Sequence, residues 1–470
     1  MVVLAEFPAG CGRFLYFCSE AMQTLRAMSV SLRNAVAVVA ALLLQPATAW
    51  AQEELSFTRH DISLGTFLGP RASASGDFNG DGHVDLINGN AAFPTSHLII
   101  LLGNGDGTFQ APASVFAGVQ ANSIVVTDFN NDGRLDLAAG SFVTSIVVVL
   151  LGNGDGTFHA AADVDVGFNS YTAASADFNR DGAPDLAVTV FNESGRNVRV
   201  YLGNGDGTFT PGAEIDEGNP GLLEVGDFDG DGIKDLATID FDFEHNRVLI
   251  LLGRGDGTFA PVAQESAVGP EAHALTVGDF DGDGQQDLAT ADNNRDLLSV
   301  LMGHGDGTFD PALELSAGAQ ICDTALHPLA IDVADFNGDG RQDLVTGNNR
   351  PSDPPHGCSV SILLGRGDGT FEPAQQFATS QGTESLVVAD FNHDGKPDLA
   401  TSNHDSSSFT ILVAGPVNVQ SEVTDPNSPA PGTATASQTG TDTGGGGSIG
   451  SELFLLFAML LTTKVRRPAD

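Results

Sequence analysis

A ten-residue segment, Asp-Phe-Asn-Gly-Asp-Gly-His-Val-Asp-Leu, constrains this chain more than any other feature. It spans residues 77–86 and recurs six more times, starting at Asp128, Asp177, Asp227, Asp279, Asp335 and Asp390. Every copy has a carboxylate or amide side chain at positions 1, 3, 5 and 9, and glycine at position 6. Glycine permits the positive φ of a sharp reversal, and hard divalent cations prefer six to eight oxygen ligands. The repeat therefore predicts seven calcium-binding loops.

These loops differ from an EF-hand in the residues on their C-terminal side. Position 12 is never glutamate, and the residues after position 10 are short and strand-like rather than helical. We therefore expect each calcium loop to join two strands. The predicted ligands are side chains at positions 1, 3, 5 and 9 and the backbone carbonyl at position 7. In chain order they are Asp77, Asn79, Asp81, His83 and Asp85; Asp128, Asn130, Asp132, Arg134 and Asp136; Asp177, Asn179, Asp181, Ala183 and Asp185; Asp227, Asp229, Asp231, Ile233 and Asp235; Asp279, Asp281, Asp283, Gln285 and Asp287; Asp335, Asn337, Asp339, Arg341 and Asp343; and Asp390, Asn392, Asp394, Lys396 and Asp398.

The segments between the loops predict the fold. Each unit has an apolar run before the loop, a short strand after it, a further apolar run, and a Gly-Asp-Gly turn followed by Thr-Phe. Asp-Gly between apolar runs is a strong hairpin signal. Four strands in a unit of about 50 residues are typical of a propeller blade. The seventh unit lacks the Gly-Asp-Gly-Thr-Phe element, and residues 56–65 resemble the strand that comes after it in other units. We therefore predict an all-β fold over residues 52–415, a seven-bladed β-propeller of four-stranded blades closed by the N-terminal strand, with the loop phenylalanines buried between blades.

The repeat resembles the FG-GAP/VCBS family, whose best-known members are the propellers of integrin α subunits. The resemblance extends over about residues 56 to 415 and implies a calcium-bound propeller. The integrin-type Phe-Gly and Gly-Ala-Pro elements are not present, and Leu-Gly-Asn-Gly-Asp-Gly-Thr-Phe stands in their place. Integrin partners are therefore not expected.

The formal net charge of −41 is concentrated in the loops and the Gly-Asp-Gly turns. Seven calcium ions, acting structurally, would offset part of it. Nucleic acid is excluded as an expected partner, because no basic patch is present that could neutralise phosphates. No catalytic constellation stands apart from the repeats, so we expect a protein that is not an enzyme.

The two ends of the chain carry signals of export. Residues 1–51 contain an apolar core of ten residues, 35–44, followed by the cleavage-like Ala49-Trp50-Ala51, which predicts a signal peptide whose true start is Met22 or Met28. Residues 416–447 are a linker rich in proline, serine, threonine and glycine. Residues 448–470 resemble the GlyGly-CTERM sorting signal of Gram-negative bacteria, with a short tail anchor as the alternative. The expected location is outside the cell, secreted or on the outer surface, with membrane contact only through the C-terminal segment.

Two further groups of residues are candidates for function. Cys322 and Cys358 are the two cysteines of the predicted mature chain, both in the enlarged loops of the sixth unit, and we expect a disulfide between them. Variable loops on a rigid scaffold commonly carry binding sites, and here they lie on the face opposite the calcium loops. Phe142 lies in one of these segments. The candidate ligand-face residues are Tyr171, Phe191, Arg196, Phe243, His245, Arg295, Asn348 and Arg350.

Three functions remain open. The first is an adhesion or ligand-binding module for an extracellular protein or glycan, acting as a monomer. The second is a calcium-dependent lectin. Sugar sites commonly use aromatic side chains for stacking, and the only tryptophan lies in the signal region, which argues against this function. The third is an extracellular polysaccharide-acting enzyme on a propeller scaffold, which a polar cluster at the mouth of the central channel would favour and scattered loop residues would not.

Overall fold

The computed structural model describes residues 53–65, 69–90, 97–192, 195–216, 218–242, 245–260, 265–269, 271–293, 296–318, 327–349, 359–416 and 418–419. All its regular elements within these ranges are β-strands. Within the same ranges there is no helix that is long and apolar enough to cross a membrane. The chain divides into two units, residues 1–421 and 422–470.

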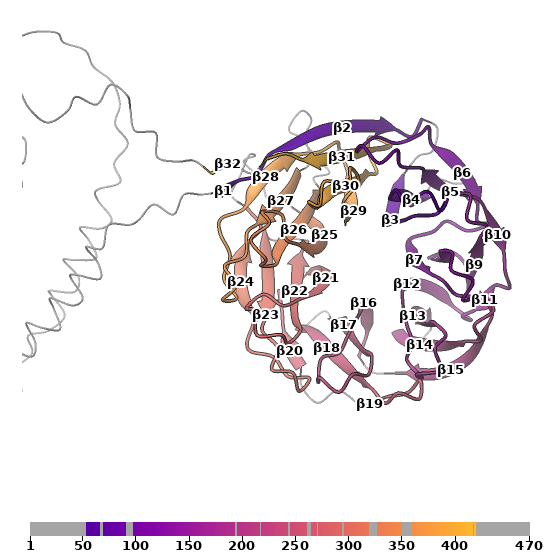
Figure 1. Ribbon diagram of the computed structural model, residues 1–470. Coiled ribbons are helices and arrows are strands. Elements are labelled where there is room, and N and C mark those ends of the chain that lie inside the picture. Colours follow the sequence, from indigo (N-terminus) through magenta and orange to yellow (C-terminus); the bar gives the residue numbers. More distant parts are fainter. Residues whose placement is uncertain are drawn as a thin grey trace, which may run out of the picture. The chain divides into compact units, whose positions relative to one another are not determined.

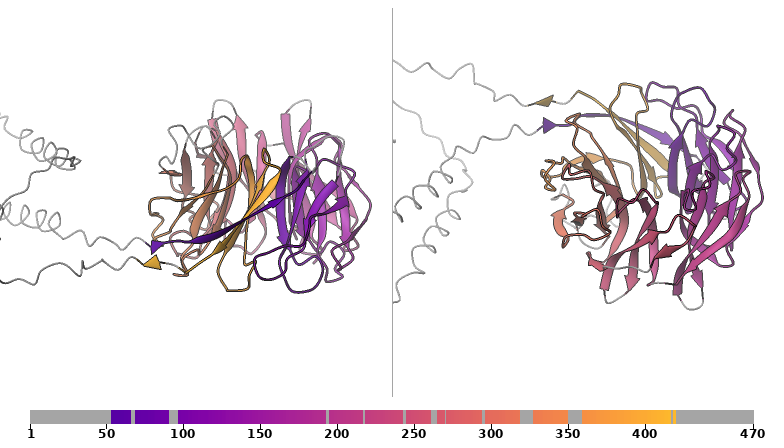
Figure 2. Two further views of the ribbon diagram at one scale, coloured as in Figure 1. Left: turned by 90° about the horizontal axis from the view of Figure 1, so that it is seen from above. Right: turned by 60° about the horizontal axis from the view of Figure 1, so that its bottom comes forward.

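The described residues of the first unit form a propeller of seven antiparallel sheets set around a common axis, as Figure 1 shows from one end and Figure 2 from the side. In every sheet the strands succeed one another from the axis outward. Blades one to three consist of β3 (Pro70–Gly76), β4 (Asp85–Asn90), β5 (His97–Leu101) and β6 (Ala113–Phe116); β7 (Ser123–Thr127), β8 (Asp136–Gly140), β9 (Ile146–Gly152), β10 (Phe158–Ala160) and β11 (Val164–Asp165); and β12 (Asn169–Ala176), β13 (Asp185–Asn192), β14 (Gly195–Gly203) and β15 (Phe209–Ile215).

The remaining blades keep this order. Their strands are β16 (Pro220–Gly226), β17 (Asp235–Asp242), β18 (His245–Gly253), β19 (Phe259–Ala260) and β20 (Glu265–Ala267); β21 (Ala272–Gly278), β22 (Asp287–Asp292), β23 (Leu297–Leu301) and β24 (Leu313–Ser316); β25 (His327–Ala334), β26 (Asp343–Asn349), β27 (Ser359–Leu363) and β28 (Gln375–Ala378); and β29 (Thr383–Ala389), β30 (Asp398–Asn403) and β31 (Ser408–Ala414). In blades two and four the outermost strand is split in two, because β10 and β11 both pair with β9, and β19 and β20 both pair with β18.

The N-terminal strand closes the ring, as predicted. β2 (Phe57–Ser63) is the fourth strand of blade seven and pairs with β31 over seven residues, from Phe57 opposite Ala414 to Ser63 opposite Ser408. The sequence did not predict a second contact between the two ends of the propeller. β1 (Glu53–Glu54) pairs with β32 (Asn418–Val419), so both ends of the described chain leave the ring side by side (Figure 1).

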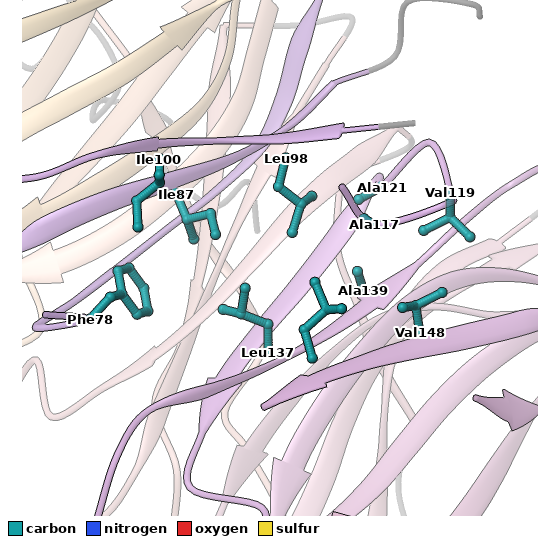
Figure 3. Packing of buried hydrophobic residues seen from close by; sticks show 11 residues of the cluster. Phe78, Ile87, Leu98, Ile100, Ala117, Val119, Ala121, Leu137, Ala139 and Val148 are labelled. Atoms are coloured by element: carbon teal, nitrogen blue, oxygen red, sulfur yellow. The ribbon is translucent and has the colours of Figure 1, made fainter. Parts of the chain in front are cut away.

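The core lies between blades rather than within them. One cluster joins Phe78, Ile87 and Leu98 of blade one to Leu137 and Val148 of blade two (Figure 3). Strands covered on both faces need apolar residues at consecutive positions, which explains the unbroken apolar runs of the sequence. The seven loop phenylalanines are buried as predicted. They are Phe78, Phe129, Phe178, Phe228, Phe280, Phe336 and Phe391.

Candidate functional site

The seven acidic loops have one geometry. In each, a carboxylate oxygen of the position-1 aspartate accepts the backbone N–H of the position-6 glycine, at 2.8 Å from Gly82 to Asp77 and 2.7 Å from Gly133 to Asp128. The other five loops repeat this bond at 2.8 to 3.0 Å. The position-6 glycines have φ between 79° and 89°, a region that other residues rarely adopt. The fold therefore bends every loop around its first carboxylate.

Two loops bring three carboxylates together. Oxygens of Asp227, Asp229 and Asp231 lie within 4.8 Å of one another, and those of Asp279, Asp281 and Asp283 do the same. Burial is the largest cause that raises the pKa of Asp229, and the neighbouring carboxylates Asp231 and Asp227 raise it further. Such clustering of like charges fits a hard divalent cation, which would offset the repulsion. The donor set is oxygen only, as calcium prefers.

The other five loops have asparagine at position 3. In four of them its amide donates to the position-5 aspartate, as from Asn79 to Asp81 at 2.9 Å, and the amide oxygen accepts the backbone N–H of the same aspartate. The amide thus replaces one carboxylate without removing an oxygen ligand. These loops fit the same cation, which would be held by positions 1, 3 and 5.

The position-9 aspartates have a role that sequence reasoning missed. Asp85 is fully buried; its Oδ2 accepts the N–H of Phe78 at 2.9 Å, and its Oδ1 accepts that of Gly103 at 2.7 Å. The same pair of bonds recurs in all seven blades. Burial raises the pKa of these carboxyls, to about 7 for Asp343. In blades one to six this carboxyl fastens the acidic loop to the turn of its own blade, and in blade seven Asp398 fastens it to Ala414 at the end of β31. Metal ligation by this position stays a prediction.

The position-7 residues are placed over the turn of the same blade. Their backbone N–H donates to the position-5 aspartate, as from His83 to Asp81 at 2.8 Å. In the six blades that have the turn, their side chains lie against the first glycine of Gly-Asp-Gly, as His83 does at Gly105 and Arg134 at Gly154. This leaves the carbonyl as the group with which position 7 would bind a cation.

Three of the predicted ligand-face residues come together. The guanidinium carbon of Arg196 lies 4.5 Å from the ring centre of Tyr171 and 4.3 Å from that of Phe191. Phe142 packs against Tyr171 with ring centres 5.2 Å apart. Phe191 is 36% exposed, and Val143 beside Phe142 is 62% exposed. We call Phe142, Tyr171, Phe191 and Arg196 the aromatic–arginine cluster.

The cluster lies at the end of the propeller opposite the acidic loops. Tyr171 is near the start of β12, whose other end leads into the loop at Asp177. Phe191 and Arg196 face each other across the β13–β14 hairpin, at the far end of those strands. Residues from blades two and three thus form one patch, which no single stretch of sequence reveals.

The remaining predicted residues have different outcomes. Asn348 is buried, with 1% of its surface exposed, and its amide donates to Ser361 at 2.8 Å inside blade six. This places it in the core rather than on a ligand face, because its neighbours on β27 are polar and satisfy it. His245 begins β18. Phe243, Arg295 and Arg350 lie outside the described residues, as do Cys322 and Cys358.

Two carboxyls on inner strands were also missed. Glu224 on β16 and Asp332 on β25 stand at equivalent positions, three residues before their loops, where other blades have alanine, valine or threonine. Burial raises the pKa of Glu224 to about 8, with a further contribution from the charge of Asp332, and burial raises that of Asp332 to about 6. The signal in the sequence was a charged residue inside an otherwise apolar run.

Replacement of Glu224 by glutamine is expected to stabilise the protein at pH 8 and above by about 2 kcal/mol. Folding raises the pKa of this carboxyl, so the folded state is fully stabilised while the pH is below the carboxyl's ordinary pKa. This stabilisation is lost as the pH rises to about 8 and the buried carboxyl is forced to ionise. Thermal unfolding from pH 4.5 to 9 measures this. The variant and the wild type should differ least at the acid end, and an equal difference at every pH would contradict the assignment. Glu214→Gln, on the exposed side of blade three, is the control.

Comparison with known proteins agrees with this geometry. The FG-GAP-like repeat matches six times, at residues 77–139, 128–188, 177–238, 227–290, 279–346 and 335–401. A search of curated proteins found no match. Among solved structures, BBS1N in complex with ARL6DN has 12% identity and a TM-score of 0.53, over 76% of this chain and 96% of that chain, and it shares the fold.

A second similar structure is an Agrocybe aegerita lectin that recognises non-reducing terminal N-acetylglucosamine. It has 20% identity and a TM-score of 0.49, over 76% of this chain and 88% of that chain. The repeat model extends across blades one to seven. This chain belongs to the family of FG-GAP-like repeat proteins.

Proposed function

We propose that this chain is an exported, calcium-stabilised propeller that binds an extracellular protein or glycan through its variable face. The aromatic–arginine cluster carries the proposal. Contact of a guanidinium with aromatic rings is worth about 1 to 2 kcal/mol where the group is partly desolvated. Arg196 therefore presents its charge in a fixed position beside exposed apolar surface, which suits recognition of a polar ligand with an apolar face.

The path of the chain supports an exposed variable face. The strands β1 and β32 leave the ring from the opened turn of blade seven, which corresponds to the acidic-loop end of the other blades. The described chain therefore leaves the ring at the end opposite the aromatic–arginine cluster. Secretion through residues 1–51, sorting through residues 448–470 to the outer surface of a Gram-negative cell, and a Cys322–Cys358 disulfide belong to this proposal.

Calcium is a structural component of the proposed function. The cations would be bound by positions 1, 3 and 5 and the position-7 carbonyl of each loop, with position 9 as the further predicted ligand, at the end away from the aromatic–arginine cluster. Their contribution would be to hold the loops and, through them, the blades. Ligand binding would then depend on calcium through the fold rather than through direct contact.

The experiment that tests this function is binding of the mature chain to glycans and matrix proteins, with calcium and with EDTA. Arg196→Ala and Tyr171→Ala are expected to weaken binding about tenfold or more, which corresponds to about 1.4 kcal/mol. Arg254→Ala, an exposed arginine in the blade-four turn, is the matched control. Binding that survives both cluster substitutions in folded protein would refute the role of this face.

The Glu224–Asp332 pair favours a second candidate, an extracellular polysaccharide-acting enzyme. A carboxyl that keeps its proton near neutral pH under the charge of a second, more acidic carboxyl has the electrostatics of a general acid with its partner. Turnover of acidic and neutral polysaccharides by the mature chain tests it. Activity abolished by both Glu224→Gln and Asp332→Asn would support the enzyme, and absence of turnover would leave the binding module.

A further inference from the structure

Neighbouring blades are joined by one repeated hydrogen bond. The second glycine of each Gly-Asp-Gly turn donates its backbone N–H to the carbonyl of the loop phenylalanine in the preceding blade. The six bonds measure 2.9 to 3.1 Å. They run from Gly107 to Phe391, Gly156 to Phe78, Gly207 to Phe129, Gly257 to Phe178, Gly307 to Phe228 and Gly369 to Phe280.

The aromatic ring after each turn reinforces this bond. Phe158 packs edge-on against Phe78 with ring centres 5.7 Å apart, and Phe371 against Phe280 at 5.6 Å. The other four turns repeat the contact at 5.4 to 6.1 Å. Six of the seven boundaries between blades are therefore closed in one way, by a tight acidic turn.

The boundary between blades six and seven is closed differently. Blade seven has only the base of a turn. There the N–H of Gly415 donates to the carbonyl of Ser56, as the N–H of Asn104 donates to the carbonyl of Thr108 in blade one. Beyond this base, the two chain segments continue as β32 and β1 and are not joined to each other by a turn. Leu55, at the place of the donating glycine, gives its N–H to the side chain of Gln375. In the described part of the chain, no turn amide reaches the carbonyl of Phe336.

The missing turn leaves a cavity. A space of about 340 Å³ is lined by Ala334, Asp335, Asn337, Gly338, Gly395, Lys396 and Pro397. A methyl group placed on Gly80 or Gly230, at position 4 of two other loops, would lie 3.5 Å from the turn of the next blade. The same group on Gly338 would meet no atom within 4 Å. The cavity therefore occupies the place over position 4 that the first glycine of a turn occupies at equivalent boundaries, while Leu55, Ser56 and Gly415 hold the base of the turn.

The charge of the cavity matches that of the missing turn. Lys396 stands at position 7, where Arg134 and Arg341 lie against the turns of their own blades. Hydrogen bonds from Thr157 lower the pKa of Asp155, the aspartate of the blade-two turn, and the charge of Arg134 lowers it further. In blade seven no such aspartate is present, and the Lys396 ammonium donates to the carbonyl of Gly415 at 2.9 Å.

We propose that this cavity binds an acidic tight turn of the Gly-Asp-Gly type from another protein. The turn would lie over Gly338 and set its carboxylate beside Lys396. The six turns of this chain define the occupant, since each one fills the equivalent place in the ring. The site is separate from the aromatic–arginine cluster and does not depend on the proposed function.

The test uses a cyclic, fluorescent peptide with the sequence Leu-Gly-Asn-Gly-Asp-Gly-Thr-Phe of residues 102–109. Fluorescence anisotropy with the full mature chain should show saturable binding at one site. Lys396→Glu should weaken it at least tenfold, and replacing the peptide aspartate by asparagine should weaken it as well. Lys234→Glu removes a lysine next to the same position in blade four, where the turn is present, and should leave binding unchanged.

Four results would overturn the proposal. The first is no binding by a chain that melts normally, and the second is equal binding by Lys396→Glu and the wild type. The third is binding that appears only after residues 422–470 are removed, since the occupant would then be the chain's own C-terminal segment. Equal loss in the Lys234→Glu control would also count against it.

Discussion

A chain that begins at residue 66 is expected to melt roughly 10 °C or more below the wild type, or to aggregate. Its loss of β2 would leave β31 as an open edge and expose the apolar surface that Phe57 and Ile62 cover. The fully buried Leu64, which is lost with them, contributes roughly 2 kcal/mol more. An exposed strand edge also promotes pairing with other chains. Thermal unfolding followed by circular dichroism, with light scattering, measures both effects.

The strand itself provides the control. A synthetic peptide of residues 52–65 should restore the melting temperature of the shortened chain by occupying the open edge, as an added strand does in β-augmentation. The same peptide with Ile62→Asp should not, because Ile62 packs into the core between blades seven and one. An unchanged melting temperature after deletion of β2 would contradict closure of the ring by this strand.

The architecture could be predicted from the sequence because one chemical pattern determines several levels of structure at once. The loop at Asp77 has a fixed spacing of oxygens and glycines, and its short strand-like flanks place it between two strands. Its regular recurrence, with the Gly-Asp-Gly turns between, determined the number of blades. The absent turn in the seventh unit predicted that residues near Phe57 complete it, and they do.

The features that the sequence did not reveal depend on side chains from distant segments. The role of Asp85 depends on a turn eighteen residues later, whose Gly103 N–H reaches its carboxylate. Asn348 was predicted to lie in a loop, yet Ser361 on the next strand satisfies it in the core. The cavity beside Lys396 exists only because blade seven is assembled from both ends of the chain. Such features require the register of strands, which composition and spacing do not specify.

Removal of calcium with EDTA is expected to lower the melting temperature by roughly 10 °C or more. A ligand present at a hundred times its dissociation constant stabilises the folded state by about 2.7 kcal/mol at each site, and seven loops have the same geometry. Without cations the carboxylates of Asp227, Asp229 and Asp231 would repel one another at short range. Thermal unfolding over a calcium titration measures the effect, with magnesium as the comparison.

Single substitutions show whether calcium raises the melting temperature by binding in the loops or only by screening the negative charge of the protein. Asp281→Ala removes one of three clustered oxygens in the blade-five loop and should reduce the calcium-dependent part of the melting temperature. Asp306→Ala, in the exposed turn of the same blade, removes an equal charge from outside the loop and should leave that part unchanged. If calcium screened only the net charge of −41, both variants would respond alike. If the loops bind no cation, EDTA would leave the wild type unchanged, and the loops would be held by their hydrogen bonds alone.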